Sequence, residues 1–309
     1  MKTTAANTLS RIHPSTTLSW KKPLLMSAIA LIICSVAISA SASSWTLVSA
    51  PTTMAGIQIG TSQLWGRDAA GNVYQYNKAT NAFDKIPSTP VFSSIAVGKG
   101  NSVWGLDGSD NIYQYNFSTK KFVEVTGKLT QIAAGGQGVW GLNSSGDIFL
   151  WNGTKFVAPP NGQPTAFSSV YVGTFGIGVW ALDASGNAYL YNTDTDFFDQ
   201  TDGKSLMSIG VGSTEVWGVT TSDTAWEYDV AAEKWIQPDK SASLNEISAG
   251  SASNIWGVNT AGEVYKFKPS ASKFELVSPQ PPEAAYRMRV SSGGIGIFVL
   301  TNSGDTYKY

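Results

Sequence analysis

Oxygen-bearing side chains recur at one fixed place in this chain, three residues after a series of tryptophans. They are Asp68, Asp107, Asn143, Asp183 and Asn259. Carboxylate and amide oxygens accept hydrogen bonds, so residues of this kind can hold the hydroxyl groups of a ligand. The same oxygens also cap the N–H groups of tight turns. These five are therefore candidate ligand-binding residues, and turn capping is the structural alternative.

Composition excludes several other kinds of chemistry once the first 42 residues are set aside. The single Cys, Cys34, and the single His, His13, both lie in that segment. The rest of the chain can therefore form no disulfide, no zinc site of the usual His and Cys ligands, and no Ser-His or Cys-His nucleophile pair. We predict no catalytic residue, no metal site and no cofactor.

The charge of the chain bears on its partners. Four of the 21 basic residues and none of the 22 acidic residues lie in the first 42 positions, so the remainder has a formal charge of about −5. Binding to nucleic acid needs a clustered basic surface that neutralises phosphates. We therefore expect no nucleic-acid partner.

Residues 1–42 have the pattern of an export signal. Lys21 and Lys22 precede an apolar run from Leu24 to about Ile38, and the run ends at Ala40-Ser41-Ala42, which resembles a cleavage site. We predict a signal peptide and a secreted, extracellular protein. The alternative is an uncleaved signal anchor, because Leu24 to Ala42 approaches the roughly 20 residues that span a bilayer. Only in that case would the protein contact a membrane. Residues 43–309 would face outward in both cases.

The tryptophans belong to a repeat of 36 to 42 residues. The repeat anchors are Trp65, Trp104, Trp140, Trp180, Trp217 and Trp256, with Phe298 as the seventh. Nine and eleven residues after every anchor stand two aromatic residues, as in Tyr74 and Tyr76. Six residues after each anchor stands a Gly or an Asp, which suits the left-handed conformation of a turn.

Between these turns the apolar residues alternate with a period of two, which predicts short, half-buried strands. Each repeat gives four strands, and the fourth begins at an aromatic residue such as Phe83 or Trp235. Four antiparallel strands per repeat predict an all-β, seven-bladed β-propeller over residues 43–309, in preference to six blades. The last repeat ends after three strands, so we expect Trp45 to Val48 to supply the outer strand of that blade.

The unit Phe-x-x-Val-x-Gly-x-Leu-x-x-Ile-Ala-x-Gly…Val-Trp-Gly-Leu-Asn-x-x-Gly-x-Ile-Phe, read from Phe122 to Phe149, resembles the repeat of tectonin and tachylectin-type lectins. The resemblance covers nearly all of residues 43–309. It implies a β-propeller, often one that binds carbohydrates on microbial or cell surfaces in defence or recognition. Some relatives use the same repeats only for protein contacts. Propellers of the family commonly have six blades, whereas this chain has seven repeats.

The binding surface is expected where the repeats differ. Length varies most in the connections from an outer strand to the next inner strand, such as Ala158 to Ala166 and Ser278 to Ala285. These connections should share one face with the turns after the anchor strands. The anchors themselves are read as packing between blades, although an indole can also stack on a sugar. Asn-x-Ser/Thr motifs mark possible N-glycosylation at Asn116, Asn143 and Asn152.

Three functions follow from these observations. We predict a non-catalytic, multivalent, lectin-like propeller whose partners are glycans or glycoconjugates. The first alternative is a propeller that binds proteins and no sugar. The second is a glycosidase, because such enzymes can work with paired carboxylates alone.

Overall fold

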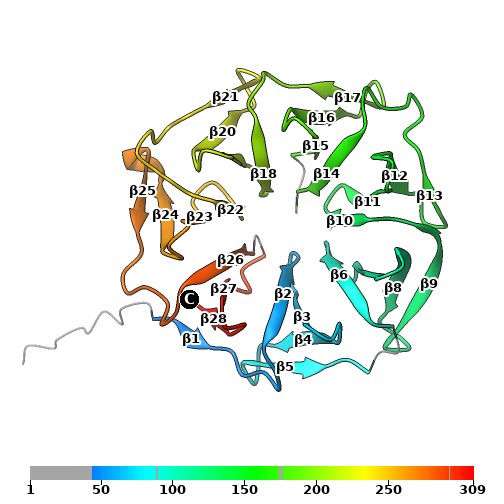
Figure 1. Ribbon diagram of the computed structural model, residues 1–309, viewed down its shortest axis with the longest axis horizontal. Coiled ribbons are helices and arrows are strands. Elements are labelled where there is room, and N and C mark those ends of the chain that lie inside the picture. The colour runs from blue at the N-terminus through cyan, green and yellow to red at the C-terminus, as the bar shows by residue number, and fades with distance from the viewer. Residues whose placement is uncertain (1–43, 88–89, 174–176, 292) are drawn as a thin grey trace, which may run out of the picture. The chain divides into compact units, whose positions relative to one another are not determined.

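The computed structural model describes residues 44–309 apart from 88–89, 174–176 and 292. Residues Ala42–Tyr309 make one compact unit. Within it, seven four-stranded antiparallel sheets stand as blades around a central axis (Figure 1). The prediction of a seven-bladed, all-β propeller is confirmed. The predicted signal peptide lies outside the described residues.

Each blade runs from an inner strand at the axis to an outer strand at the rim. Blade 1 is β2 (Met54–Ile59), β3 (Leu64–Asp68), β4 (Val73–Asn77) and β5 (Ala82–Lys85), and blade 2 is β6 (Phe92–Val97), β7 (Val103–Asp107), β8 (Asn111–Asn116) and β9 (Lys121–Lys128). Blade 3 is β10 (Gln131–Gly135), β11 (Gly138–Leu142), β12 (Ile148–Trp151) and β13 (Phe156–Val157). Blade 4 is β14 (Phe167–Val172), β15 (Val179–Asp183), β16 (Ala188–Asn192) and β17 (Phe197–Gln200).

The remaining blades follow the same order. Blade 5 is β18 (Leu206–Val211), β19 (Val216–Thr220), β20 (Ala225–Asp229) and β21 (Lys234–Ile236). Blade 6 is β22 (Glu246–Ala249), β23 (Ile255–Val258), β24 (Val264–Lys268) and β25 (Lys273–Leu276), with a 3₁₀ turn at Pro269–Ala271. Blade 7 is β26 (Ala285–Val290), β27 (Ile297–Thr301), β28 (Thr306–Lys308) and β1 (Thr46–Leu47).

Tight turns join the second and third strands of every blade. The residue six positions after each anchor lies in this turn, and its φ is positive in all seven blades, as the sequence predicted. These residues are Gly71, Asp110, Gly146, Gly186, Asp223, Gly262 and Gly304. The turns also sit against the next blade. A Cβ added to Gly71 would lie 2.8 Å from the carbonyl oxygen of Phe92 at the start of blade 2. Glycine is therefore needed there for conformation and for space.

The core consists of seven clusters, each shared by two adjacent blades. All seven repeat anchors, Trp65 to Trp256 and Phe298, are at most 2% exposed. Each anchor packs edge-on against the eleventh-position aromatic of the next blade, with ring centroids 4.7–5.2 Å apart. Phe298 continues this pattern by packing on Tyr76 of blade 1. The anchors are thus the joints between blades, and they are not available as stacking surfaces.

The ring is closed by the segment around β1. Thr46 and Leu47 pair with Lys308 and Tyr307 of β28, which confirms that this segment forms the outer strand of the last blade. The chain then crosses to blade 1, where Ser49 bonds to both Asn81 and Phe83 through its backbone. One segment therefore ties blade 7 to blade 1.

No helix in the described part of the chain is long and apolar enough to cross a membrane.

Candidate functional site

The five candidate ligand residues lie on five different blades, each at the turn after the anchor strand. Asp68 shows the arrangement. Its Oδ1 accepts the backbone N–H of Asn72 at 2.8 Å, and its Oδ2 accepts the Asn72 amide at 2.8 Å and the Tyr74 hydroxyl at 2.9 Å. The side-chain oxygens at the other four positions, Asp107, Asn143, Asp183 and Asn259, accept the equivalent backbone N–H groups. Thr220 and Thr301 occupy the same position in blades 5 and 7.

These turn contacts set the charge state of the aspartates. Burial alone would raise the pKa of Asp68, Asp107 and Asp183, but hydrogen bonds from the turn stabilise the carboxylates and hold each pKa below its usual value. Burial, and then the hydrogen bond to Asp68, raises the pKa of Tyr74 to about 12. The aspartates are therefore ionised turn caps, and their ligand-binding role stays a prediction.

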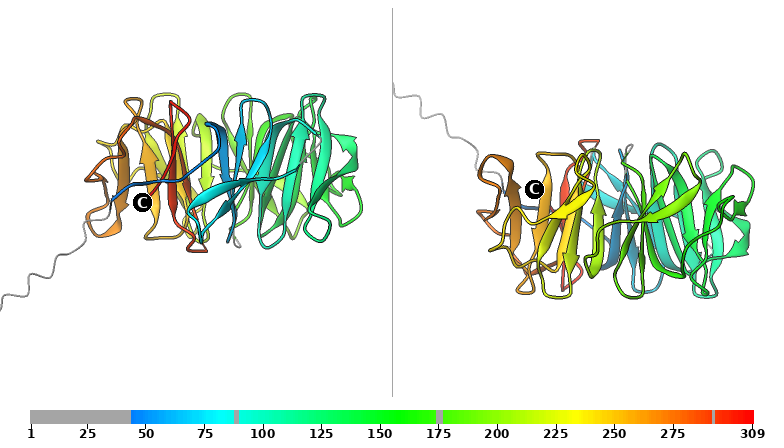
Figure 2. Two further views of the ribbon diagram at one scale, coloured as in Figure 1. Left: turned by 90° about the horizontal axis from the view of Figure 1, so that it is seen from below. Right: turned by 90° about the horizontal axis from the view of Figure 1, so that it is seen from above.

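The turns after the anchor strands and the outer-to-inner connections lie on one face, as expected from the sequence. In all seven blades the residue six positions after the anchor accepts, through its carbonyl, a backbone N–H at the start of the next blade's inner strand, at 2.7–3.1 Å. We call this surface the turn face and the opposite surface the far face. Both appear edge-on in Figure 2.

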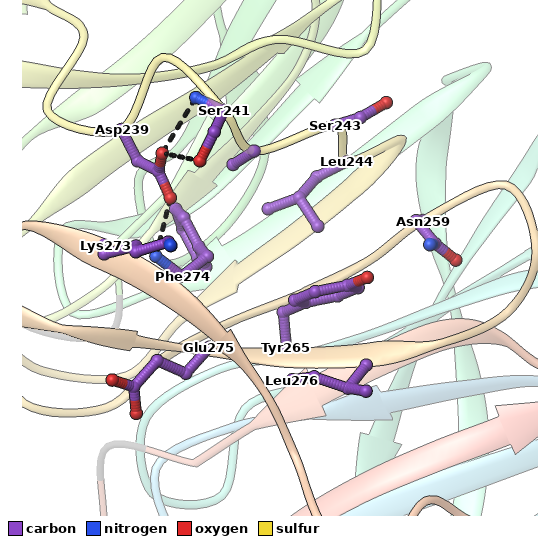
Figure 3. Close-up of a pocket in the computed structure, with 11 residues that line it drawn as sticks. Asp239, Ser241, Ser243, Leu244, Asn259, Tyr265, Lys273, Phe274, Glu275 and Leu276 are labelled. Atoms are coloured by element: carbon purple, nitrogen blue, oxygen red, sulfur yellow. Dashed lines mark hydrogen bonds between the residues drawn. The ribbon is translucent and has the colours of Figure 1, made fainter.

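One pocket on the turn face brings a candidate residue together with an aromatic ring. It has a volume of about 440 Å³ and lies between blade 6 and the connection that leaves blade 5 (Figure 3). Asn259 and the half-buried Tyr265 come from the β23–β24 hairpin, and Ser241 and Ser243 come from the connection. The remaining lining residues include Asp239, Leu244, Lys273, Glu275 and Leu276. The other four candidate residues are on other blades and do not meet here.

The pocket holds its polar groups in place by internal bonds. Asp239 is 7% exposed, and it accepts the N–H and hydroxyl of Ser241 and the N–H of Phe274 at 2.6–2.8 Å (Figure 3). Burial would raise the pKa of Asp239, but these bonds outweigh it and keep the group ionised. Asn259 donates to Glu263 at 2.7 Å, and the Tyr265 hydroxyl donates to the same carboxylate at 3.2 Å. Lys273 and Glu275 remain exposed at the rim.

Several of these groups carry no signal in the repeat pattern of the sequence. No repeat position marks Ser241, Ser243, Lys273 and Glu275. Trp235 and Trp256 are as far apart in sequence as Phe83 and Trp104, so the connection that carries the serines does not stand out by its length. The polar run from Asp239 to Ser243 was the available signal.

A second cavity of about 440 Å³ follows the central axis. Arg287 and Arg289 of β26 both line it. Arg289 bonds to Glu246 at 2.7 Å and also to the Ile57 carbonyl, so it links blades 6, 7 and 1. Arg287 is exposed and lies against the ring of Tyr286.

The possible glycosylation sites are spread over both faces. Asn143 lies in a turn on the turn face, where its Oδ1 caps Ser145 and Asp147. Asn116 and Asn152 cap turns on the far face, at the ends of β8 and β12, and both are exposed. Within the described residues, no group of three or more His, Cys, Asp and Glu side chains could hold a metal ion.

Comparison with solved structures shows the fold alone. The chain is similar to a structure described as YCF48 bound to D1 peptide (13% identity, 86% of this chain and 94% of that chain, TM-score 0.64). It is also similar to YCF48 from Cyanidioschyzon merolae (15%, 86% and 98%, 0.64) and to yeast RCC1 (Prp20) in a complex with Kap60 (10%, 82% and 79%, 0.59).

Comparison with curated proteins gives no match. A family model described as the tectonin domain matches residues 53–173 and 166–277, which together exceed half of the chain. With seven registered repeats folded as blades, this chain belongs to the tectonin family.

Proposed function

We propose that this protein is a non-catalytic, multivalent carbohydrate-binding propeller that uses its turn face. The observation that carries the proposal is the pocket between blades 5 and 6. Sugars present both apolar C–H surfaces and hydroxyl groups, so they suit a half-buried aromatic ring surrounded by hydrogen-bonding groups. Tyr265 supplies the ring, and Asn259, Ser243 and Glu275 supply the polar groups.

The repeat supports the proposed multivalency. The same capped turn stands at the same level in all seven blades, so neighbouring blades offer related surfaces on one face. Sites that are weak one by one gain apparent affinity when they engage a clustered ligand, by a factor of about 10² to 10⁴. We therefore propose that surface glycans or glycoconjugates, such as those of microbes, are the ligands.

A catalytic role is less well supported by the pocket. Glycosidases need two carboxyl groups about 5 to 10 Å apart with separate acid and base roles. Asp239 has both oxygens engaged by N–H and O–H groups and lies beneath the surface, so it is a structural acceptor. The exposed Glu275 is then left without a catalytic partner among the residues that line the pocket.

Protein binding is the second candidate function. The solved structures that are similar in fold include, by their descriptions, one bound to a peptide and one bound to a protein. The exposed Arg287 and Tyr286 of the axial strand β26 favour protein binding here too, because Arg and Tyr are enriched in protein interfaces.

We further propose that residues 1–42 direct export of the protein, and N-terminal sequencing of the secreted form tests this point.

A glycan array with product analysis separates these functions. The purified protein should bind a set of glycans saturably and release no product. Turnover of a bound glycan would indicate an enzyme. Binding to peptides with no glycan bound would indicate a protein-binding propeller and would overturn the proposal.

A further inference from the structure

One anchor tryptophan lacks a hydrogen bond that the others make. The indole N–H of Trp65, Trp104 and Trp256 donates to the side chain two residues earlier, which is Gln63, Ser102 and Asn254 respectively. Trp140 and Trp180 donate to a backbone carbonyl three residues earlier. In blade 5, Trp217 is 1% exposed and its Nε1 has no partner. A buried N–H without an acceptor is destabilising, because it loses its hydrogen bond to water and gains none in the protein.

The residue at the accepting position in blade 5 is Glu215, and its carboxyl group lies in hydrogen-bonding contact with Glu227. In blade 1 the two residues that flank the anchor ring are Gln63 and Gln75, and the Gln75 amide donates to the same Gln63 oxygen that accepts the Trp65 N–H. In blade 5 these two positions are Glu215 and Glu227, and Glu227 lies directly opposite Trp217 in the sheet. Two carboxyl groups can bond to each other only when they share a proton.

The surroundings favour a shared proton. Both glutamates are half-buried, and the adjacent carboxylate is Asp229. Burial first, and then the contact with Glu215, raises the pKa of Glu227 to about 7. Blade 6 presents Phe267 and Phe274 to the Trp217 ring. Two lysines of blade 6 have other partners. The Lys266 ammonium group lies over the ring of Trp256, and Lys268 forms an ion pair with Glu275 at 4.0 Å. In blade 5, Lys234 stands opposite Asp229.

From this arrangement we propose that Glu215 and Glu227 form a proton-operated switch at the joint between blades 5 and 6. In the protonated state the two carboxyl groups bond to each other, and the Trp217 N–H is left without an acceptor. Loss of the shared proton makes the two carboxylates repel. Glu215 then turns to accept the Trp217 N–H, as Gln63 does for Trp65 in blade 1. No other part moves, because the anchor ring stays packed between blades.

Blade 1 supplies the matched control. The double variant E215Q/E227Q gives blade 5 the same three side chains as blade 1, with amides in place of the titrating carboxyl groups. The neutral pair keeps the shape of the glutamates. In this variant the side chain at position 215 should accept the Trp217 N–H at every pH. The comparison with the wild type therefore separates titration from a general loss of structure.

The indole resonance of Trp217, assigned by its absence in Trp217→Phe, reports the switch directly. We expect it to shift between about pH 5 and about pH 9 with a midpoint near 7, while the other anchor indoles stay constant. In E215Q/E227Q it should be fixed near its high-pH position in the wild type. The proposal is overturned if the Trp217 resonance does not titrate, or if it titrates in the same way in the double variant.

Discussion

Val48 provides a sharp test of how the ring is closed. It follows β1, is 2% exposed, and lies in the core cluster that joins blades 7 and 1, with Tyr76 and Phe298. Val48→Ala removes two buried carbon atoms at about 0.8 kcal/mol each, and the cavity adds to this, so we expect a loss of about 2–3 kcal/mol. For a domain of this size the melting temperature should fall by about 4–6 °C, because the unfolding entropy is about 2.1 cal/mol/K per residue.

The neighbouring Leu47 is the control. It belongs to the same strand but is 50% exposed, so Leu47→Ala should change the free energy of unfolding by less than about 0.5 kcal/mol. Urea unfolding of both variants, followed by tryptophan fluorescence, gives the comparison. If the two variants were equally stable, Val48 would not be part of a closing joint. Removal of residues 44–49 should have a larger effect, because it leaves the edge of β28 unpaired and uncovers Phe298.

Three further predictions concern the joints and turns. Trp140→Ala should cost about 3–5 kcal/mol in an unfolding titration, and a cost below about 1 kcal/mol would contradict the role of the anchors. Gly71→Ala should destabilise by more than about 1 kcal/mol, whereas Gly100→Ala, where a Cβ meets no atom, should cost less despite its positive φ. Because the pKa of Asp68 and Asp107 is lowered in the fold, their stabilisation is present above the unfolded pKa of about 3.9 and is lost as pH falls through the folded pKa. Asp107→Asn keeps the cap, as Asn143 does in blade 3, and should reduce this acid sensitivity; equal acid sensitivity in the variant and the wild type would count against it.

The fold was predictable from the sequence because the repeats are in register. The anchor and its two following aromatics recur at fixed offsets, so one repeat fixes the strand order of all seven. The closing strand was predictable because Trp45 to Val48 matched a strand that the last repeat lacked. Each of these signals is local, and each is repeated.

The pocket on the turn face was only partly predictable. Asn259 was a candidate because its turn repeats, but its pocket depends on how the connection from blade 5 lies against Tyr265 and Lys273. Such contacts join segments that are distant in sequence, and no repeat reports them. The pairing of Glu215 with Glu227 was within reach, since the equivalent positions can be read from every blade. Its significance emerged only from the unpartnered N–H of Trp217.

A titration of single-site variants tests the proposed carbohydrate binding on the turn face. The glycan that binds best on an array should be titrated against the wild type, Tyr265→Ala and Val230→Ala. Val230 is 58% exposed and lies after β20 on the far face, so it is a matched surface control. We predict that Tyr265→Ala weakens binding at least about tenfold, equivalent to about 1.4 kcal/mol, while Val230→Ala binds like the wild type. Unchanged binding in Tyr265→Ala, or an equal loss in both variants, would contradict a carbohydrate site in this pocket.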